Sequence, residues 1–305
     1  MHRLLAAFVC ACLALLAARP AATEEYRRIG YGRLVTNDQF GDVKDRDRTG
    51  AYTASHIFGA GWDGRLPTRP GDLFELRFHA ETMTPRYMQV IAPGDRPYAG
   101  SLSLGLHTHF RHGATEVSLG GDVVVTGPQT GLDDLQLLVH GVLGGAKASR
   151  AVRDNQIPDG VHPTLVTEIA HPVRLGANTR LRPFLEGRAG AETMLRAGAD
   201  LTIGQVGAGE LLIRESSSGH RYRAIKAAPQ GYSVVLGGDI ARVKESVFLP
   251  AARGYELTDR KRLRAGVHWQ GRRHAVFYGL TWLDREFERQ EGGQVIGSLR
   301  LDIRF

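Results

Sequence analysis

The segment 97–110, PYAGSLSLGLHTHF, alternates between two kinds of side chain along its whole length. One set of alternate positions is mainly apolar: Tyr98, Gly100, Leu102, Leu104, Leu106, Thr108 and Phe110. The other set is small or polar: Ala99, Ser101, Ser103, Gly105, His107 and His109. A period of two places the sets on opposite faces of a β-strand. The pattern therefore predicts a strand with one face in lipid and the other facing a wet or tightly packed lumen.

The last segment, 294–305, repeats this pattern. Its apolar positions are Val295, Gly297, Leu299, Leu301, Ile303 and Phe305. Its other face carries Ser298, Arg300, Asp302 and Arg304. A soluble sandwich also alternates, but charges in the middle of strands suit the polar lumen of a membrane barrel.

Twelve segments show such alternation, and bacterial single-chain barrels have an even number of strands. They are 28–37, 51–62, 72–83, 97–110, 115–126, 163–174, 180–191, 196–205, 231–243, 260–270, 273–286 and 294–305. In the first segment Ile29, Tyr31 and Val35 share a phase with Asn37, which indicates a bulge. The sequence thus predicts an all-β fold, a twelve-stranded antiparallel transmembrane barrel.

The N-terminus reads as a secretory signal peptide, residues 1–22, which leaves 23–305 as one barrel domain. Its apolar run, residues 4–18, is short for a membrane-spanning helix of about 20 residues; a retained anchor helix is the alternative. Both cysteines, Cys10 and Cys12, lie in this signal. The mature chain then depends on a regular scaffold and has no disulfide.

Composition excludes several other classes. The formal charge of +7 falls to +5 when Arg3 and Arg19 leave with the signal, and no basic run is interleaved with aromatics, so nucleic-acid binding is not expected. No segment after residue 22 is apolar for even twelve residues, which excludes helical membrane spans.

The connections predict which side chains share an end of the barrel. Those at 38–50, 84–96, 127–162 and 244–259 are long, and strand parity places them together on the outer face. The connection 206–230 is also long, but parity places it on the periplasmic side. Within 127–162, the segment 133–144 (DDLQLLVHGVLG) has helical spacing, with Leu135, Leu138, Val139 and Val142 as one apolar stripe.

Parity gathers Asn37, Asp38, Thr53, Gln136 and His140 at one rim, where they would suit hydrolysis of an ester. Neutral His140 would take a proton from water. Asp38, with oxygens of Asn37 or Thr53, would hold a hard cation such as calcium, which would polarise the carbonyl. Gln136 would orient the water or donate to the oxyanion. No G-x-S-x-G elbow supports a serine nucleophile.

Structural interpretations stand beside these roles. A histidine on an amphipathic helix is often simply packed, and Asn-Asp at a strand end is usually turn chemistry. His107 and His109 are expected to line the lumen rather than bind metal. A group of arginines is expected to pair with lumen acids such as Glu186: Arg182, Arg188, Arg262 and Arg264.

The chain resembles the outer-membrane lipid A 3′-O-deacylase family over essentially its whole mature length. The most specific motifs are GDRPYAG at 94–100 and the Gln136-x-x-x-His140 helix. The remaining carriers are Asn37-Asp38-Gln39-Phe40, Asp47-Arg48, Ala51-Tyr52-Thr53-Ala54, Thr84-Pro85, Gly127-Pro128 and Gln156.

The resemblance implies a twelve-stranded barrel that hydrolyses the 3′ acyloxyacyl ester of lipid A with calcium. It implies a base at His140, helped by Asn37, Asp38, Thr53 and Gln136, and water attack without an acyl-enzyme. Arg86 and Arg96 are assigned to substrate binding, and lipopolysaccharide, the outer membrane and a monomeric state are expected.

The chain departs from the family at two positions. The family carries a functional lysine between strands 3 and 4, whereas this chain has no lysine between Lys44 and Lys147. Arg86 is the candidate replacement, although an arginine fork differs from an ammonium point charge. The family's acidic residue six positions after the histidine is Ala146 here.

Three functions are therefore open. The first is a calcium-assisted lipid A 3′-O-deacylase whose active site faces the outer leaflet. The second is a non-enzymatic lipopolysaccharide-binding or structural barrel of the same family. The third is a small porin, against which large inward side chains and only twelve strands argue.

Overall fold

The computed structural model describes residues 26–143, 145–227 and 230–303. The predicted signal peptide, residues 1–22, lies outside the described residues, as do Gly144, the last residue of the predicted helical segment, and the terminal Phe305.

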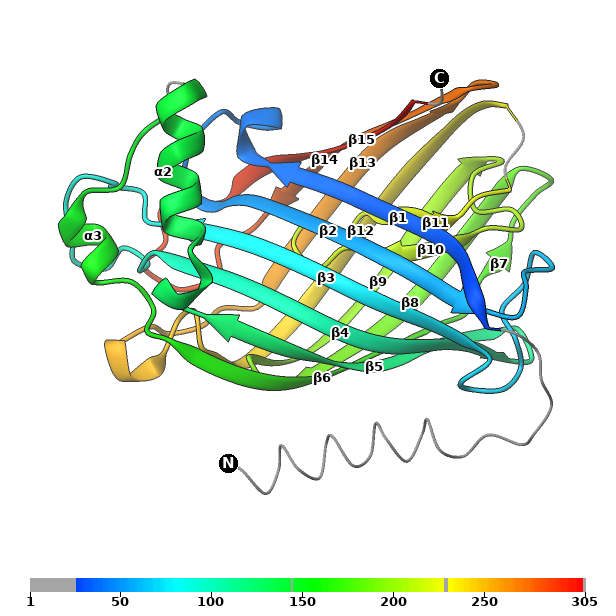
Figure 1. Cartoon of the computed structure of the whole chain (residues 1–305), viewed down its shortest axis with the longest axis horizontal. Coiled ribbons are helices and arrows are strands. Elements are labelled where there is room, and N and C mark those ends of the chain that lie inside the picture. Colours follow the sequence, from blue (N-terminus) through cyan, green and yellow to red (C-terminus); the bar gives the residue numbers. More distant parts are fainter. Residues whose placement is uncertain (1–25, 144, 228–229, 304–305) are drawn as a thin grey trace.

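Twelve long antiparallel strands form one closed barrel (Figure 1). They are β1 (Arg27–Asn37), β2 (Asp47–Gly59), β3 (Leu73–Thr84), β4 (Ala99–His112), β5 (Thr115–Thr126), β6 (Gly160–Ala170), β8 (Thr179–Ala189), β9 (Glu192–Gly204), β12 (Gly231–Ser246), β13 (Arg260–Gln270), β14 (His274–Leu283) and β15 (Gln294–Ile303). The pairings β1–β15 and β6–β8 close the ring, and the two-residue β7 (Val173–Arg174) pairs with β8. The predicted fold class is confirmed.

The predicted alternation sets the two faces of the wall. In β4, Leu104 is 55% exposed on the outward face, whereas Ser103 and His107 are buried on the inward face. The predicted irregularity in the first strand is also present, because the pairing of β1 with β2 skips Ile29 between Arg28 and Gly30.

The two ends of the barrel differ. One, which we call the helical end, carries the segments 38–46, 85–98, 127–159, 247–259 and 284–293 (Figure 1). Its helices are η1 (Asp38–Phe40), η2 (Pro128–Thr130), α2 (Leu132–Leu143), α3 (Arg150–Asp154) and η3 (Ala251–Arg253). The other, the turn end, carries segments that include the tight turns 113–114 and 271–273. Within the described ranges, no helix is long and apolar enough to cross a membrane.

The connection between β9 and β12 folds back into the lumen. It forms a hairpin of β10 (Leu211–Arg214) and β11 (Arg221–Ile225), which we call the plug hairpin (Figure 1). Tyr222 is buried and its hydroxyl lies 2.6 Å from Ser55 Oγ on β2. The sequence predicted a long connection on this side but did not predict that it would enter the barrel.

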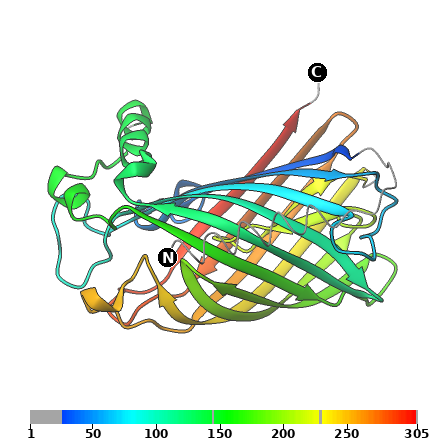
Figure 2. The ribbon, with the colours of Figure 1, turned by 60° about the horizontal axis from the view of Figure 1, so that its bottom comes forward.

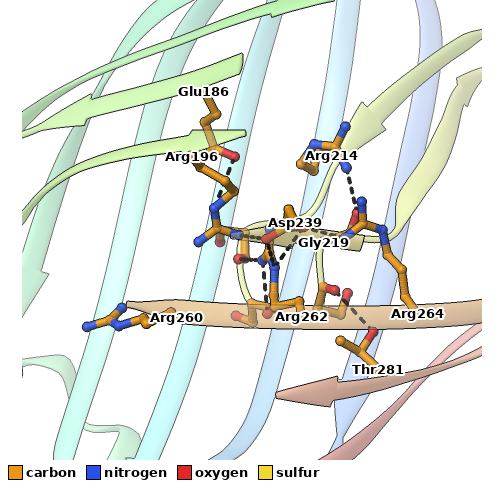
Figure 3. A network of polar contacts seen from close by, with 12 residues as sticks. Glu186, Arg196, Arg214, Gly219, Asp239, Arg260, Arg262, Arg264 and Thr281 are labelled. Carbon is orange, nitrogen blue, oxygen red and sulfur yellow. Dashed lines mark hydrogen bonds and ion pairs between the residues drawn. The ribbon is translucent and has the colours of Figure 1, made fainter. Parts of the chain in front are cut away.

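Ion pairs join the plug hairpin to the wall (Figure 3). Asp239 on β12 accepts from Arg196, Arg262 and Arg264, and Arg262 Nη1 also donates to Ser216 O at the hairpin tip. Arg214 of the hairpin donates to Asp200 on β9 at 2.8 Å. The predicted pairing of lumen arginines with acids is confirmed, and Arg188 pairs with Glu186 as expected. The lumen therefore contains paired charges as well as a buried apolar cluster, in which Ile213 of the hairpin is grouped with Leu34 and Phe277 of the wall.

Candidate active site

Helix α2 lies outside the barrel wall, across the strands at the helical end (Figures 1 and 2). Gly100 shares the outward phase of β4 with Leu104, and Leu132 at the start of α2 packs on it. A Cβ at Gly100 would lie 3.1 Å from Leu132 Cβ, so glycine permits this close approach. The start of α2 is therefore held closely against the outward face of the wall.

The GDRPYAG motif provides the seat for the helix. Asp95 accepts hydrogen bonds from the backbone N–H groups of Tyr87 (3.0 Å) and Arg96 (2.8 Å), which fixes the loop before β4. Tyr98 is buried, and its hydroxyl donates to Gln136 Oε1 at 2.7 Å. The other amide atom of Gln136, Nε2, is buried and has no hydrogen-bond partner among the described residues. Gln136 is thus an oriented donor with an open N–H.

His140, one turn beyond Gln136, projects from the same face of α2. Its Nδ1 lies 3.3 Å from Asp45 Oδ2 and 2.5 Å from Ala146 O. A Cβ at Gly145 would come within 2.7 Å of the His140 ring, so glycine allows the following chain to close on the imidazole. No hydrogen bond or ion pair within the described ranges involves Nε2. The arrangement engages Nδ1 and leaves Nε2 free for proton transfer.

The carboxylate of Asp38 lies buried in the loop that carries Asp45. Asn37 caps η1 by accepting from Gln39 N at 2.7 Å, and Asp38 Oδ2 accepts from Arg46 N at 3.2 Å. Asp38 Oδ1 is buried with no hydrogen-bond partner in the described structure. Burial, and next the charge of Asp45, raise the pKa of Asp38 to about 8. Burial also raises the pKa of Asp45, which the nearby His140 opposes.

These carboxylates fit a cation by donor chemistry. Oδ1 of Asp38, Oδ1 of Asp42 and both side-chain oxygens of Asp45 are buried without hydrogen-bond partners in the described structure. Orphaned carboxylate oxygens are the donors that calcium prefers. The described residues contain no ready group of three or more His, Cys, Asp or Glu side chains placed around a metal position. A calcium site here would therefore need backbone, hydroxyl or water oxygens as well.

Thr53 does not join this group. Its hydroxyl faces the lumen, 2.7 Å from His79 Nδ1, and the other nitrogen of that ring lies 3.3 Å from Ser216 Oγ of the plug hairpin. The placement of Thr53 beside Asp38 was wrong because the second strand was predicted to begin at residue 51, whereas β2 begins at Asp47 and Thr53 is its seventh residue, well inside the wall.

Thr49 is the threonine that lies at the rim. It precedes Gly50, the partner of Asn37 in the strand register, and its buried hydroxyl lies 2.6 Å from Thr84 Oγ1. Thr53 lies four residues farther along β2, about 13 Å at the rise of an extended strand. In the sequence, Thr49 lies in the segment 45–50, DRDRTG. The same segment contains Asp45, which contacts His140 in the structure.

The two arginines assigned to substrate are held by acids. Arg86 Nη1 pairs with Glu291 Oε2 at 2.8 Å, and Arg86 Nη2 donates to the backbone O of the same residue. Arg96 is 2% exposed and pairs with Glu286, which also pairs with Arg48 on β2. Arg96 therefore braces the helical end from within, and the charge of Arg86 is already neutralised.

Comparisons with known proteins agree with this architecture. The model of the family described as Outer membrane protein LpxR matches residues 5–305. LpxR from Salmonella typhimurium is 19% identical, covers 90% of this chain and 100% of its own, and superposes with a TM-score of 0.69. A comparison with curated protein sequences returned no match.

More distant barrels also match. The KdgM porin is 4% identical (90% of this chain, 98% of its own, TM-score 0.38), and the NanC porin is 6% identical (90% and 100%, TM-score 0.40). Likenesses this weak support no inference about this chain. The family match, in contrast, confirms the resemblance carried by GDRPYAG and the Gln136–His140 helix. The chain therefore belongs to the LpxR family of outer membrane proteins, and its twelve-stranded barrel is an outer-membrane barrel.

Proposed function

We propose that this protein is a lipid A 3′-O-deacylase that hydrolyses the 3′-linked acyloxyacyl ester by water attack. Family membership supports lipid A deacylation at the level of the family. The observation that carries the proposal for this chain is the contact of His140 Nδ1 with Asp45 Oδ2, at 3.3 Å, beneath a helix on the outward side of the wall.

His140 acts as the general base. Its free Nε2 takes a proton from a water molecule as that water attacks the ester carbonyl, and the carboxylate of Asp45 stabilises the imidazolium that forms. The proton then passes from Nε2 to the leaving alkoxide, so the products are a free fatty acid and a sugar hydroxyl. Neither product requires a covalent intermediate with the enzyme.

Gln136 stabilises the oxyanion. Tyr98 holds its Oε1, so the unpartnered Nε2 is the group available to donate to the negative oxygen of the tetrahedral intermediate. The removal of one such donor costs about two to three orders of magnitude in rate in other hydrolases.

Asp38 would hold a calcium ion, with Asp42 and Asp45 contributing further negative charge. When bound, the ion supplies Lewis-acid polarisation of the carbonyl. Thr53 is not part of this proposed set, because its hydroxyl faces the lumen; Asn37, the residue before Asp38, is the adjacent neutral oxygen side chain.

The helical end is proposed to face the outer leaflet, where lipid A resides. A site between α2 and the outward face of the wall opens towards lipid rather than towards the lumen. The ester of a membrane lipid would then reach His140 sideways from the bilayer.

Mass spectrometry of lipid A tests the proposal in cells that express the wild type, His140→Ala or the control His112→Ala at the turn end. The wild type and His112→Ala are expected to lose the 3′ acyl chains, and His140→Ala to retain them. Unchanged acylation with the wild type, with and without calcium, would reject the deacylase.

A non-enzymatic lipopolysaccharide-binding barrel is the second candidate. It is favoured by Ala146 at the family's acidic position and by the pairing of Arg86 with Glu291 in a segment without lysine. It predicts lipid A binding that persists in His140→Ala and no acyl release by the wild type.

A further inference from the structure

We propose that α2 is an interfacial helix whose exposed apolar stripe inserts among the acyl chains of the bilayer. The stripe consists of four side chains with large exposed fractions: Leu135 (52%), Leu138 (66%), Val139 (41%) and Val142 (78%). At about 100° per residue these positions span roughly 100° of the helix circumference. They form one continuous face, and no described residue buries it.

The polarity of α2 is opposite to that of a helix on a soluble protein. Asp133 is buried, and Gln136 and His140 are turned towards the wall and the 38–46 loop, while the four residues of the stripe face away. A helix in water buries its apolar face and exposes its polar one. The reversed arrangement is stable only where the surroundings of the outer face are apolar.

The position of α2 identifies these surroundings as lipid. Leu132 packs on Gly100, which belongs to the same outward phase of β4 as Leu104, a residue of the membrane-facing surface. In both views the helix stands off from the outside of the wall rather than over the lumen (Figures 1 and 2). The stripe therefore continues the lipid-facing surface of the barrel.

Neighbouring loops at the helical end add exposed apolar and basic side chains. Val43 (64% exposed) precedes Asp45 by two residues, and Val90 (57%) follows Gln89, whose side chain donates to Lys147 O. Lys147 and Arg150 follow the helix and are exposed. Basic residues beside an apolar helix face are typical of helices that lie in the headgroup region.

Insertion of the stripe would place the substrate ester beside His140. The acyl chains would stay in the hydrocarbon of the bilayer, while the ester at the polar boundary would reach the opposite face of the helix, where Gln136 and His140 lie. This functional consequence, unlike the insertion, rests on the proposed deacylase.

Site-directed spin labelling tests the insertion. The variants Leu138→Cys and Val142→Cys place a nitroxide on the stripe, and Asp134→Cys is the matched control, since its side chain is 79% exposed on the same helix. The only native cysteines, Cys10 and Cys12, lie in the predicted signal peptide, so the exported protein carries one label. Collision with oxygen and with a polar nickel chelate is measured in phospholipid–lipopolysaccharide vesicles.

We expect labels at 138 and 142 to favour oxygen over the nickel chelate, and the label at 134 to favour nickel. Equal nickel accessibility at all three positions would overturn the proposal. Spin–spin broadening at 138 would also overturn it, because a second copy of the chain would then cover the stripe.

A second measurement separates insertion from catalysis. The double variant Leu138→Ser/Val142→Ser is expected to deacylate lipid A in vesicles about tenfold more slowly than the wild type. Its rate on detergent-dispersed lipid A should be unchanged, and Asp134→Ser should match the wild type in both assays. Equal loss in both assays would reject the insertion role. Absence of wild-type activity would reject the deacylase while the labelling result stands.

Discussion

Asp45 Oδ2 lies 3.3 Å from Nδ1 of His140, although the two residues come from different connections, one between β1 and β2 and the other between β5 and β6. The contact supplies a carboxylate to the histidine from another connection, whereas the residue six positions after the histidine, Ala146, carries no acid. Nδ1 of His140 also lies 2.5 Å from the backbone O of Ala146, so this residue contacts the histidine through its carbonyl group.

Asp45→Asn should lower kcat by about two orders of magnitude, because an amide cannot stabilise the imidazolium formed at His140. If Asp45 acts through His140, the double variant Asp45→Asn/His140→Ala should be no slower than His140→Ala alone. The control is Asp63→Asn at the turn end. Multiplicative losses in the double variant would show that Asp45 acts independently of the histidine.

Ala146→Glu should strengthen calcium binding, because it adds a carboxylate oxygen next to the group formed by Asp38 and Asp45. The calcium concentration for half-maximal deacylation is expected to fall. The control Ala252→Glu, at an exposed position of η3, should leave that concentration unchanged. Calcium titrations of the three proteins measure this. An unchanged midpoint for Ala146→Glu would place the cation elsewhere.

The pH dependence of stability should reveal Asp38. Its pKa of about 8 in the folded barrel lies above the value of about 4 for an unfolded aspartate, so folding favours the protonated form. Without calcium, stability should therefore fall as the pH rises from about 4 through about 8, and calcium should oppose the fall by pairing with the carboxylate. Thermal unfolding in detergent, with chelator or with calcium, gives the two curves.

Asp38→Asn is the matching variant, and it should flatten the chelator curve and abolish the effect of calcium. The same pH slope in Asp38→Asn as in the wild type would assign the titration to another group.

Asp239→Ala should destabilise the barrel by about 3–5 kcal/mol, since it leaves the buried guanidinium groups of Arg196, Arg262 and Arg264 without their common acceptor. Urea unfolding in detergent measures the loss. Asp72→Asn, which breaks the exposed pair with Arg69, should change stability by less than about 1 kcal/mol. Similar losses in both variants would mean that the lumen network contributes no more than a surface pair.

Much of the fold could be predicted because alternate side chains of each strand face different surroundings, lipid on the outside of the wall and the polar lumen on the inside. Segments with clear alternation form strands whose bounds lie within a few residues of the prediction; the segment predicted at 97–110, for example, is β4, Ala99–His112. The plug hairpin could not be predicted, because β10 and β11 have only four and five residues and are held by contacts with distant strands. These contacts include the ion pair of Arg214 with Asp200 and the apolar packing of Ile213 in a cluster with Phe277.

The site was predictable only in part. Helical spacing correctly related Gln136 to His140. The motif GDRPYAG identified the family, but its contacts with the helix, through Tyr98 and Gly100, were found only in the structure. Thr53 was misplaced because β2 begins four residues earlier than predicted, at Asp47, so Thr53 lies inside the strand and Thr49 lies nearer its start. Asp45 was missed because its contact with His140 spans 95 residues of sequence, and no local pattern records such a distance.

Purified protein in vesicles that contain lipid A provides the most direct test of the central claim, with released fatty acid and residual lipid A both measured by mass spectrometry. With calcium, the wild type should release the 3′-linked acyl chains, and His140→Ala should release none above the rate without protein. Release by His140→Ala at the wild-type rate, or intact lipid A after incubation with the wild type, would contradict the account.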